Sequence, residues 1–201
     1  MRSTALLALV ALAATPVTAC VADTAPAADA TPTNTECASG TGEFSTRQVD
    51  GIEVGLPSDW TAGPHREKGD GSPDSDELVT ALYYWSPSVR CGIMLAIVSE
   101  QFANSAEDAT RRMTKSMDED YPNPEYGPVS TVSFAGQEWA RQMGTSGDKM
   151  LALRTQMSKH NNLWYGIVEI AERDKNASEL AFASATSDMF ASVEQSFSFP
   201  K

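Results

Sequence analysis

Residues 150–171, MLALRTQMSKHNNLWYGIVEIA, decide the fold of this chain. Two strand-like runs, Met150–Ser158 and Leu163–Ala171, flank the triplet His160-Asn161-Asn162. Asparagine is typical of tight turns because its backbone tolerates a positive φ. The pattern therefore predicts a long antiparallel β-hairpin.

Further strands are predicted on both sides of this hairpin. Residues 92–99 are apolar on both faces, which is typical of a strand in the middle of a sheet. The other predicted strands are 52–56, 78–85, 129–134, 137–143 and a short final one at Phe197 and Phe199. The polar stretch Gly63–Glu77 is predicted to be a loop.

Two helices are predicted. Ser105 opens the first, with Asp108 three residues later in the spacing of a capping box. Its apolar stripe comprises Ala109, Met113, Met117 and Tyr121, and the stripe of a second helix, starting near Asn176, comprises Phe182, Ala185, Met189 and Val193. Because few strands are joined by helices, we expect an α+β fold with two helices packed on a mainly antiparallel sheet.

The N-terminus predicts export. Behind Arg2, Ala5–Ala14 is an unbroken run of Ala, Leu and Val, too short to cross a bilayer, which takes about 20 residues. Val17-Thr18-Ala19 before Cys20 resembles a bacterial lipobox. Residues 1–19 are therefore predicted to be a lipoprotein signal peptide, and Cys20 the lipidated residue. The alternative is an ordinary secretion signal followed by a chance cysteine.

The remainder divides into a tether and one domain. Residues 20–44 consist largely of Ala, Thr, Pro, Asp and Gly, which cannot bury enough apolar surface to fold. Residues 45–201 contain all four Trp and all five Tyr and have the length of one domain. We therefore expect a disordered tether that leads into a single folded domain.

The net charge narrows the range of partners. Without Arg2, the mature chain has 14 basic and 27 acidic residues, a net charge of −13. Such a surface repels nucleic acid and anionic lipid headgroups. We expect no nucleic-acid partner, and a connection to the membrane only through the lipid on Cys20.

The cysteines suggest one disulfide. If Cys20 carries the lipid, Cys37 and Cys91 remain as a pair in an oxidising compartment. We predict that they form a bridge. The alternative is two unrelated thiols, with Cys91 buried at the start of a strand.

Several phrases resemble those of a known family. Four phrases occur in the order found in the LpqN-type lipoproteins of actinobacteria: IEVGLPSDW (52–60), SAEDATRRM (105–113), VSFAGQEWARQM (132–143) and SVEQSFSF (192–199). The resemblance covers nearly all of residues 45–199 and the lipobox. It implies a PsbP-like α/β sandwich and an association with envelope biogenesis and lipid-exporting membrane proteins. It brings no catalytic motif, and the fold serves several unrelated functions.

Candidate catalytic and metal sites are few. His65 and His160 have no second His or Cys at ligand spacing, so no zinc is expected. Ser146–Lys149 matches S-x-x-K without its partner motifs and is interpreted as a turn. Acidic residues gather at Asp70, Asp74, Asp76 and Glu77, which favours a solvated loop over a calcium site. No cofactor is expected.

Two functions remain. The first is a non-enzymatic binding or accessory lipoprotein on the extracytoplasmic face of the cell membrane, whose partner is an envelope membrane protein or an envelope lipid. The second is an envelope hydrolase with an unrecognised Ser or carboxylate site. We expect the first. Trp60, at a strand exit, is a candidate for the ligand or partner surface, although burial is the ordinary role of a large aromatic residue.

Overall fold

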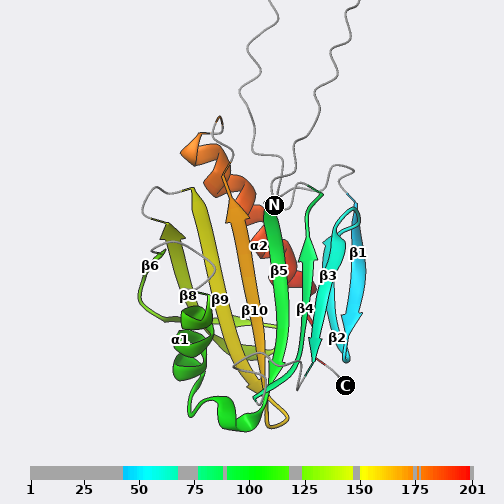
Figure 1. Ribbon diagram of the computed structural model, residues 1–201, viewed down its shortest axis with the longest axis vertical. Coiled ribbons are helices and arrows are strands. Elements are labelled where there is room, and N and C mark those ends of the chain that lie inside the picture. The colour runs from blue at the N-terminus through cyan, green and yellow to red at the C-terminus, as the bar shows by residue number, and fades with distance from the viewer. Residues whose placement is uncertain are drawn as a thin grey trace, which may run out of the picture. The chain divides into compact units, whose positions relative to one another are not determined.

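The computed structural model describes residues 43–67, 77–87, 90–117, 124–146, 150–173, 176 and 178–199. These residues form two antiparallel sheets and two α-helices (Figure 1). The α+β class expected from the sequence is confirmed.

The main sheet has eight strands in the order β3-β4-β5-β10-β9-β8-β6, and β7 also pairs with β8. All its pairings are antiparallel. The strands are β3 (Thr61–Glu67), β4 (Leu78–Trp85), β5 (Cys91–Val98), β6 (Pro124–Tyr126), β7 (Ser130–Phe134), β8 (Gln137–Ser146), β9 (Leu151–His160) and β10 (Leu163–Glu172). The second sheet is the hairpin of β1 (Phe44–Val49) and β2 (Ile52–Pro57).

The predicted long hairpin is confirmed as β9–β10. His160 pairs with Leu163, and the two residues between them, Asn161 and Asn162, have φ of 47° and 62°. Asparagine accommodates this left-handed region better than most residues. In the main sheet, this hairpin lies in the middle, between β5 and β8.

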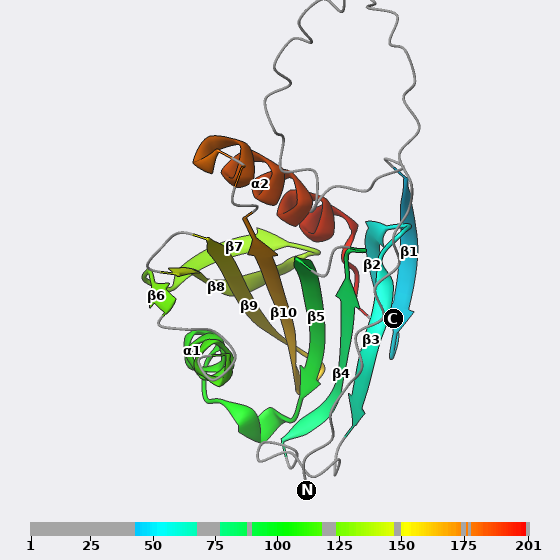
Figure 2. The same cartoon turned by 45° about the horizontal axis from the view of Figure 1, so that its top comes forward.

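The main sheet is covered on both faces, as Figure 2 shows. Helix α1 (Ala106–Ser116) packs against β8 and β9 on one face, with a core that includes Met113, Met157 and Trp164. Helix α2 (Glu179–Ser196) and the β1–β2 hairpin cover the other face, over Trp139 and Ile167. Because side chains of a strand alternate between faces, β9 and β10 supply residues to both cores.

The predicted cap of the first helix is confirmed. The Ser105 hydroxyl accepts a hydrogen bond from the backbone N–H of Asp108 at 3.1 Å, and the Asp108 carboxylate accepts one from the N–H of Asn104 at 3.2 Å. The helix ends at Ser116, with Met117 as its C-cap. The predicted stripe is therefore shorter than expected, and Tyr121 lies outside the described residues.

Three predicted boundaries were wrong. Strand β1 begins at Phe44, which the sequence analysis placed in the tether. Strand β3 runs from Thr61 to Glu67, whereas a loop was predicted from Gly63 onward, because pairing with β4 satisfies the backbone of an edge strand whatever its side chains. The predicted final strand is a single bridge between Ser198 and Glu53.

No helix among the described residues has the length and apolar character needed to cross a membrane.

Candidate functional site

The site with the clearest geometry is a groove of about 620 Å³ at one end of the main sheet, on the face covered by α1. Its volume lies in the range of about 300–1,000 Å³ that is usual for binding sites. Four side chains from four neighbouring strands form its floor: Ser133, Glu138, Lys159 and Trp164. We call these four residues the transverse row.

The strand register produces the transverse row. Ser133 of β7 pairs with Glu138 of β8, and Lys159 of β9 pairs with Trp164 of β10, so each pair shares a face of the sheet. The last pair between β8 and β9 at this end of the sheet is Ala140 with Met157. Glu138 lies two residues from Ala140 along β8, and Lys159 lies two residues from Met157 along β9. By alternation, all four side chains lie on the α1 face.

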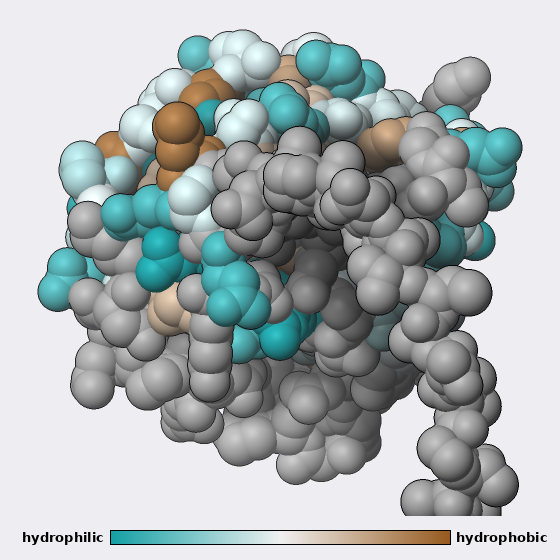
Figure 3. All heavy atoms as spheres, turned by 90° about the horizontal axis from the view of Figure 1, so that it is seen from above, coloured by the Kyte–Doolittle hydropathy of each residue, from teal (hydrophilic) through white to brown (hydrophobic). Residues whose placement is uncertain are grey.

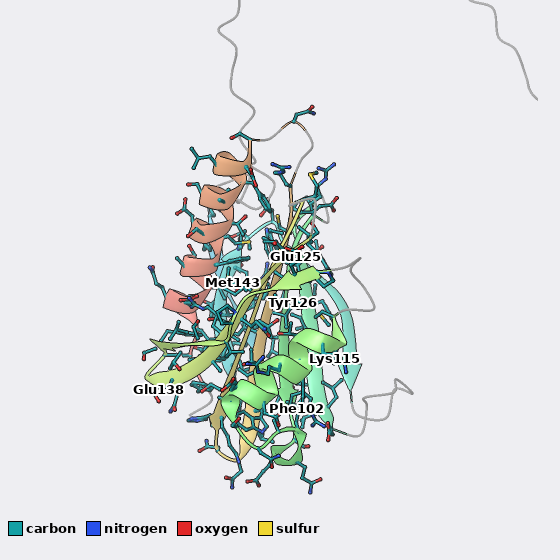
Figure 4. All side chains as sticks on the ribbon, turned by 90° about the vertical axis from the view of Figure 1, so that its left-hand side faces the viewer. Phe102, Lys115, Glu125, Tyr126, Glu138 and Met143 are labelled. Atoms are coloured by element: carbon teal, nitrogen blue, oxygen red, sulfur yellow. The ribbon has the colours of Figure 1, made fainter. Side chains whose placement is uncertain are left out.

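The groove is open because β8 separates from β9 at this point. Beyond the Ala140–Met157 pair, β8 continues with β7 alone, and the Ser158 hydroxyl donates to the Glu138 carbonyl at 2.7 Å across the gap. Helix α1 begins only at Ala106, which lines the groove. Figure 4 shows Glu138 near the tip of the β7–β8 hairpin, at the same end of the sheet as Phe102, which precedes α1.

Two donors of the groove, the Lys159 ammonium and the Trp164 indole, are engaged within the protein. The Lys159 ammonium lies 2.9 Å from a carboxylate oxygen of Glu100 and 5.5 Å from the centre of the Trp164 ring. The indole N–H of Trp164 donates to the backbone carbonyl of Glu100 at 3.2 Å. The exposed Glu138 side chain, in contrast, forms no ion pair with a described residue. The groove therefore presents an unneutralised carboxylate beside a neutralised lysine.

A second polar cluster lies on the opposite face, beneath α2. Glu169 of β10 is fully buried and accepts hydrogen bonds from Arg154 and Gln156 of β9. Glu194 of α2 reaches the same place, 2.6 Å from Arg154 and 2.5 Å from Arg141. Burial raises the pKa of Glu169 to about 7, although the charge of Arg154 acts in the opposite direction. The two carboxylates are thus paired with arginines and covered by the helix.

A column of aromatic rings closes the same face near the C-terminus. Phe134 stacks on Trp139 with ring centres 4.4 Å apart, Phe199 lies 5.5 Å beyond Trp139, and His160 stacks on Phe199 at 4.4 Å. His160 therefore serves in packing, and its ring also contacts Asn161. From the sequence, His160 was predicted only to lie in the hairpin turn.

Of the site residues predicted from the sequence, Trp60 and Cys91 are among the described residues and both are buried. Trp60 is 2% exposed and belongs to the core on the α2 face, so its assignment to a ligand or partner surface was wrong. It is buried because the β1–β2 hairpin and α2 enclose the strand exit where it lies. Cys91, at the start of β5, is fully buried, whereas Cys20 and Cys37 lie outside the described residues. The disulfide and the lipid site stay predictions.

The weaker chemical candidates do not form a reactive centre in the described part of the chain. The Ser146 hydroxyl accepts hydrogen bonds from the backbone N–H groups of Met150 and Leu151, as in a turn, and Lys149 is not described. The side chain of His65 and residues Asp70, Asp74 and Asp76 also fall outside the description. No group of three metal-ligating residues occurs among the residues that could be searched.

Exposed apolar side chains are dispersed. Among the described residues, the large ones are Phe44, Val79, Met143 and Leu180, on β1, β4, β8 and α2. Figure 3 shows separate apolar spots among polar residues on the face that it presents. The groove, and not an apolar patch, is therefore the candidate binding surface.

Comparison with known proteins establishes the fold. No protein-family model and no curated protein sequence matches the chain. Cyanobacterial PsbP from Synechocystis superposes with a TM-score of 0.52 at 12% identity, over 78% of this chain and 91% of that one. A point mutant of the protein Mog1 gives 0.52 at 9% identity, over 78% and 96%. The domain thus has the PsbP-like fold that the resemblance implied.

A third structure is LpqN, described as involved in cell envelope biogenesis of Mycobacterium tuberculosis. It superposes with a TM-score of 0.44 at 11% identity, over 79% of this chain and 91% of that one. The fold rests on the first two structures, and at identities this low they show nothing beyond the fold.

The transverse row was missed in the sequence. Its members are up to 31 positions apart, from Ser133 to Trp164. The hairpin register could have paired Lys159 with Trp164, because both flank the Asn161-Asn162 turn. The separation of β8 from β9, which brings Glu138 to the same groove, has no sequence signal that we can identify.

Proposed function

We propose that this protein is an exported lipoprotein, anchored through Cys20, whose domain is a non-enzymatic binding module. Its partner is the exposed part of an envelope membrane protein, or an envelope lipid handled by such a protein. The observation that carries this proposal is the open groove over the transverse row. A pre-formed concave site with both polar and aromatic lining is typical of binding.

The chemistry of the lining favours binding over hydrolysis. The described residues lining the groove include Ser133, Ser158 and one carboxylate, Glu138, but no histidine. The hydroxyl proton of Ser158 is already donated to a backbone carbonyl. A hydrolase needs a nucleophile beside a base, or two carboxylates open to substrate, and Glu169 and Glu194 are instead paired with arginines beneath α2.

The anchor supports a partner near the membrane. The short apolar run Ala5–Ala14 and the lipobox-like residues before Cys20 are typical of a lipoprotein signal. If Cys37 bridges to Cys91, the free tether is residues 21–36, which spans about 20–24 Å root-mean-square and at most about 55 Å. A tether of that reach raises the effective concentration of the domain for anything embedded there.

The net charge supports a protein partner over direct contact with lipid. A mature chain with net charge −13 is repelled by anionic headgroups, so lying flat on the membrane is unfavourable. The tether and the charge together favour an upright domain that contacts a neighbouring membrane protein.

The anchor is tested by mass spectrometry and by complementation in the native host. We expect a diacylated Cys20 at the mature N-terminus, and loss of function for Cys20→Ala at normal expression. Full rescue of a deletion phenotype by the unanchored chain would show that proximity to the membrane is not needed. An unacylated Cys20 N-terminus would refute the anchor itself.

The groove is tested by photo-crosslinking in intact cells. A photoreactive amino acid at exposed Ser133, in the groove, should capture a membrane-embedded partner. The same amino acid at exposed Thr46, on β1, is the control and should capture little. Equal yields at the two positions would contradict a role for the groove.

A further inference from the structure

The groove over the transverse row contains one carboxylate, Glu138, that forms no ion pair with a described residue. Lys159 is paired with Glu100, the Trp164 N–H is donated to the Glu100 carbonyl, and the Ser158 proton is donated to the Glu138 carbonyl. The Glu138 carboxylate accepts no hydrogen bond from a described residue. A ligand that pairs with this carboxylate donates hydrogen bonds and carries positive charge.

We propose that the groove binds an arginine side chain of a partner protein. The guanidinium has five N–H donors, has no acceptor and stays charged at all physiological pH values. Its planar edge pairs with a carboxylate in two parallel hydrogen bonds, which suits the exposed Glu138 better than a compact ammonium does. This inference rests on the proposed function as a binding module and names the chemistry that the module recognises.

The position of Lys159 makes the groove selective for cationic ligands over anionic ones. Glu100 and the Trp164 ring hold the ammonium on the side of the groove away from β7. A cation that enters from the β7–β8 side meets Glu138 first, while the Lys159 charge is already compensated by Glu100. Lys159 is the one cation among the described residues that line the groove, and it is paired with Glu100, so a phosphate headgroup is disfavoured.

The overall charge of the protein acts in the same direction. A mature chain with a net charge of −13 attracts basic surfaces at long range and speeds their encounter. Such attraction alone is unspecific, and the local contact with Glu138 is what should discriminate arginine from other cations and from neutral analogues.

The test uses the mature lipidated chain in neutral detergent. The probe is a labelled, end-blocked peptide Gly-Ser-Arg-Ser-Gly, and its matched control carries citrulline, the neutral isostere, in place of arginine. We expect saturable binding of the arginine peptide, a shift of the Trp164 indole N–H signal, and at least about tenfold weaker binding of the citrulline peptide.

Variants locate the contact. Glu138→Gln should weaken the arginine peptide about tenfold. Asp50→Asn removes the same charge from the β1–β2 turn, where Asn tolerates the φ of 46°, and should change binding less than twofold. Equal affinity for both peptides, an unchanged affinity in Glu138→Gln, an equal loss in Asp50→Asn, or no binding at all would each overturn the proposal.

Lipid vesicles test whether the groove binds a lipid headgroup instead of an arginine side chain. If vesicles of phosphatidylglycerol shift the Trp164 signal and the arginine peptide does not, the groove belongs to a lipid and the proposal is overturned. The result is independent of the anchor and crosslinking tests. Peptide binding without partner capture at Ser133 in cells would contradict the proposed function alone, and capture without peptide binding would contradict only the arginine assignment.

Discussion

Arg154 and Glu169 lie side by side in the interface between the main sheet and α2. Their side chains come from paired neighbouring strands, Nη2 of Arg154 donates to Oε1 of Glu169 at 2.7 Å, and Nε donates to the other carboxylate oxygen. The guanidinium also lies 4.2 Å from the centre of the Phe190 ring of α2. This pair sets two expectations about stability.

The first prediction concerns pH. Because the pKa of Glu169 is raised to about 7 in the folded protein and is near 4.5 when unfolded, the folded state binds more protons between these values. The contribution of Glu169 is therefore fully present below about pH 4.5 and is lost as the pH rises through about 7. Its size is on the order of 3 kcal/mol.

Urea unfolding of the wild type and Glu169→Gln at pH 5 and pH 8 measures this contribution. The variant cannot titrate at this position, so the wild type should lose more free energy of unfolding between the two pH values than the variant does. Parallel pH profiles of the two proteins would show that Glu169 is ionised across the range.

The second prediction concerns the pair itself. At pH 8, where Glu169 is ionised in the wild type, Arg154→Met removes the bidentate partner of the buried carboxylate and should lower the free energy of unfolding by about 3–5 kcal/mol. The double variant Arg154→Met, Glu169→Leu removes both charges and should recover most of that loss. A double variant as unstable as the single one would mean that the cost lies in packing against Phe190 and not in the orphaned charge.

The third prediction concerns close packing at Gly92 of β5. Trp85 of β4 pairs with Gly92, and a Cβ placed on Gly92 would lie 2.4 Å from Cε3 of the indole. Gly92→Ala should lower the free energy of unfolding by about 1–3 kcal/mol. Gly127→Ala is the control, because its nearest atom is the Met143 carbonyl oxygen at 3.7 Å. Similar losses in both variants would contradict the argument.

The fourth prediction concerns the cysteines. Non-reducing peptide mapping of the exported protein should link the peptide with Cys37 to the peptide with Cys91. Loss of the bridge should lower the free energy of unfolding by on the order of 3 to 4.5 kcal/mol, because the unfolded chain is then less constrained. Alkylation of both cysteines without prior reduction would refute the pairing.

Local signals in the sequence were enough for the main elements. The Asn161-Asn162 turn, the Ser105 cap and the stripe of α2 through Phe182, Met189 and Val193 were all predicted and are all present. Each depends on residues a few positions apart, where backbone preference and periodicity act directly. The edge strand β3 was missed because it contains Gly63 and Pro64 and no large apolar residue, and because its pairing with β4 is not local.

The sequence by itself determined the α+β class and the central hairpin, because these depend on short-range pattern. Only the tertiary structure decided that Trp60 is buried, that Glu169 pairs with Arg154, and that Glu138 and Lys159 flank one groove. The physical reason is that these facts depend on strand register and on the point where β8 separates from β9. Both are set by packing among residues far apart in the chain.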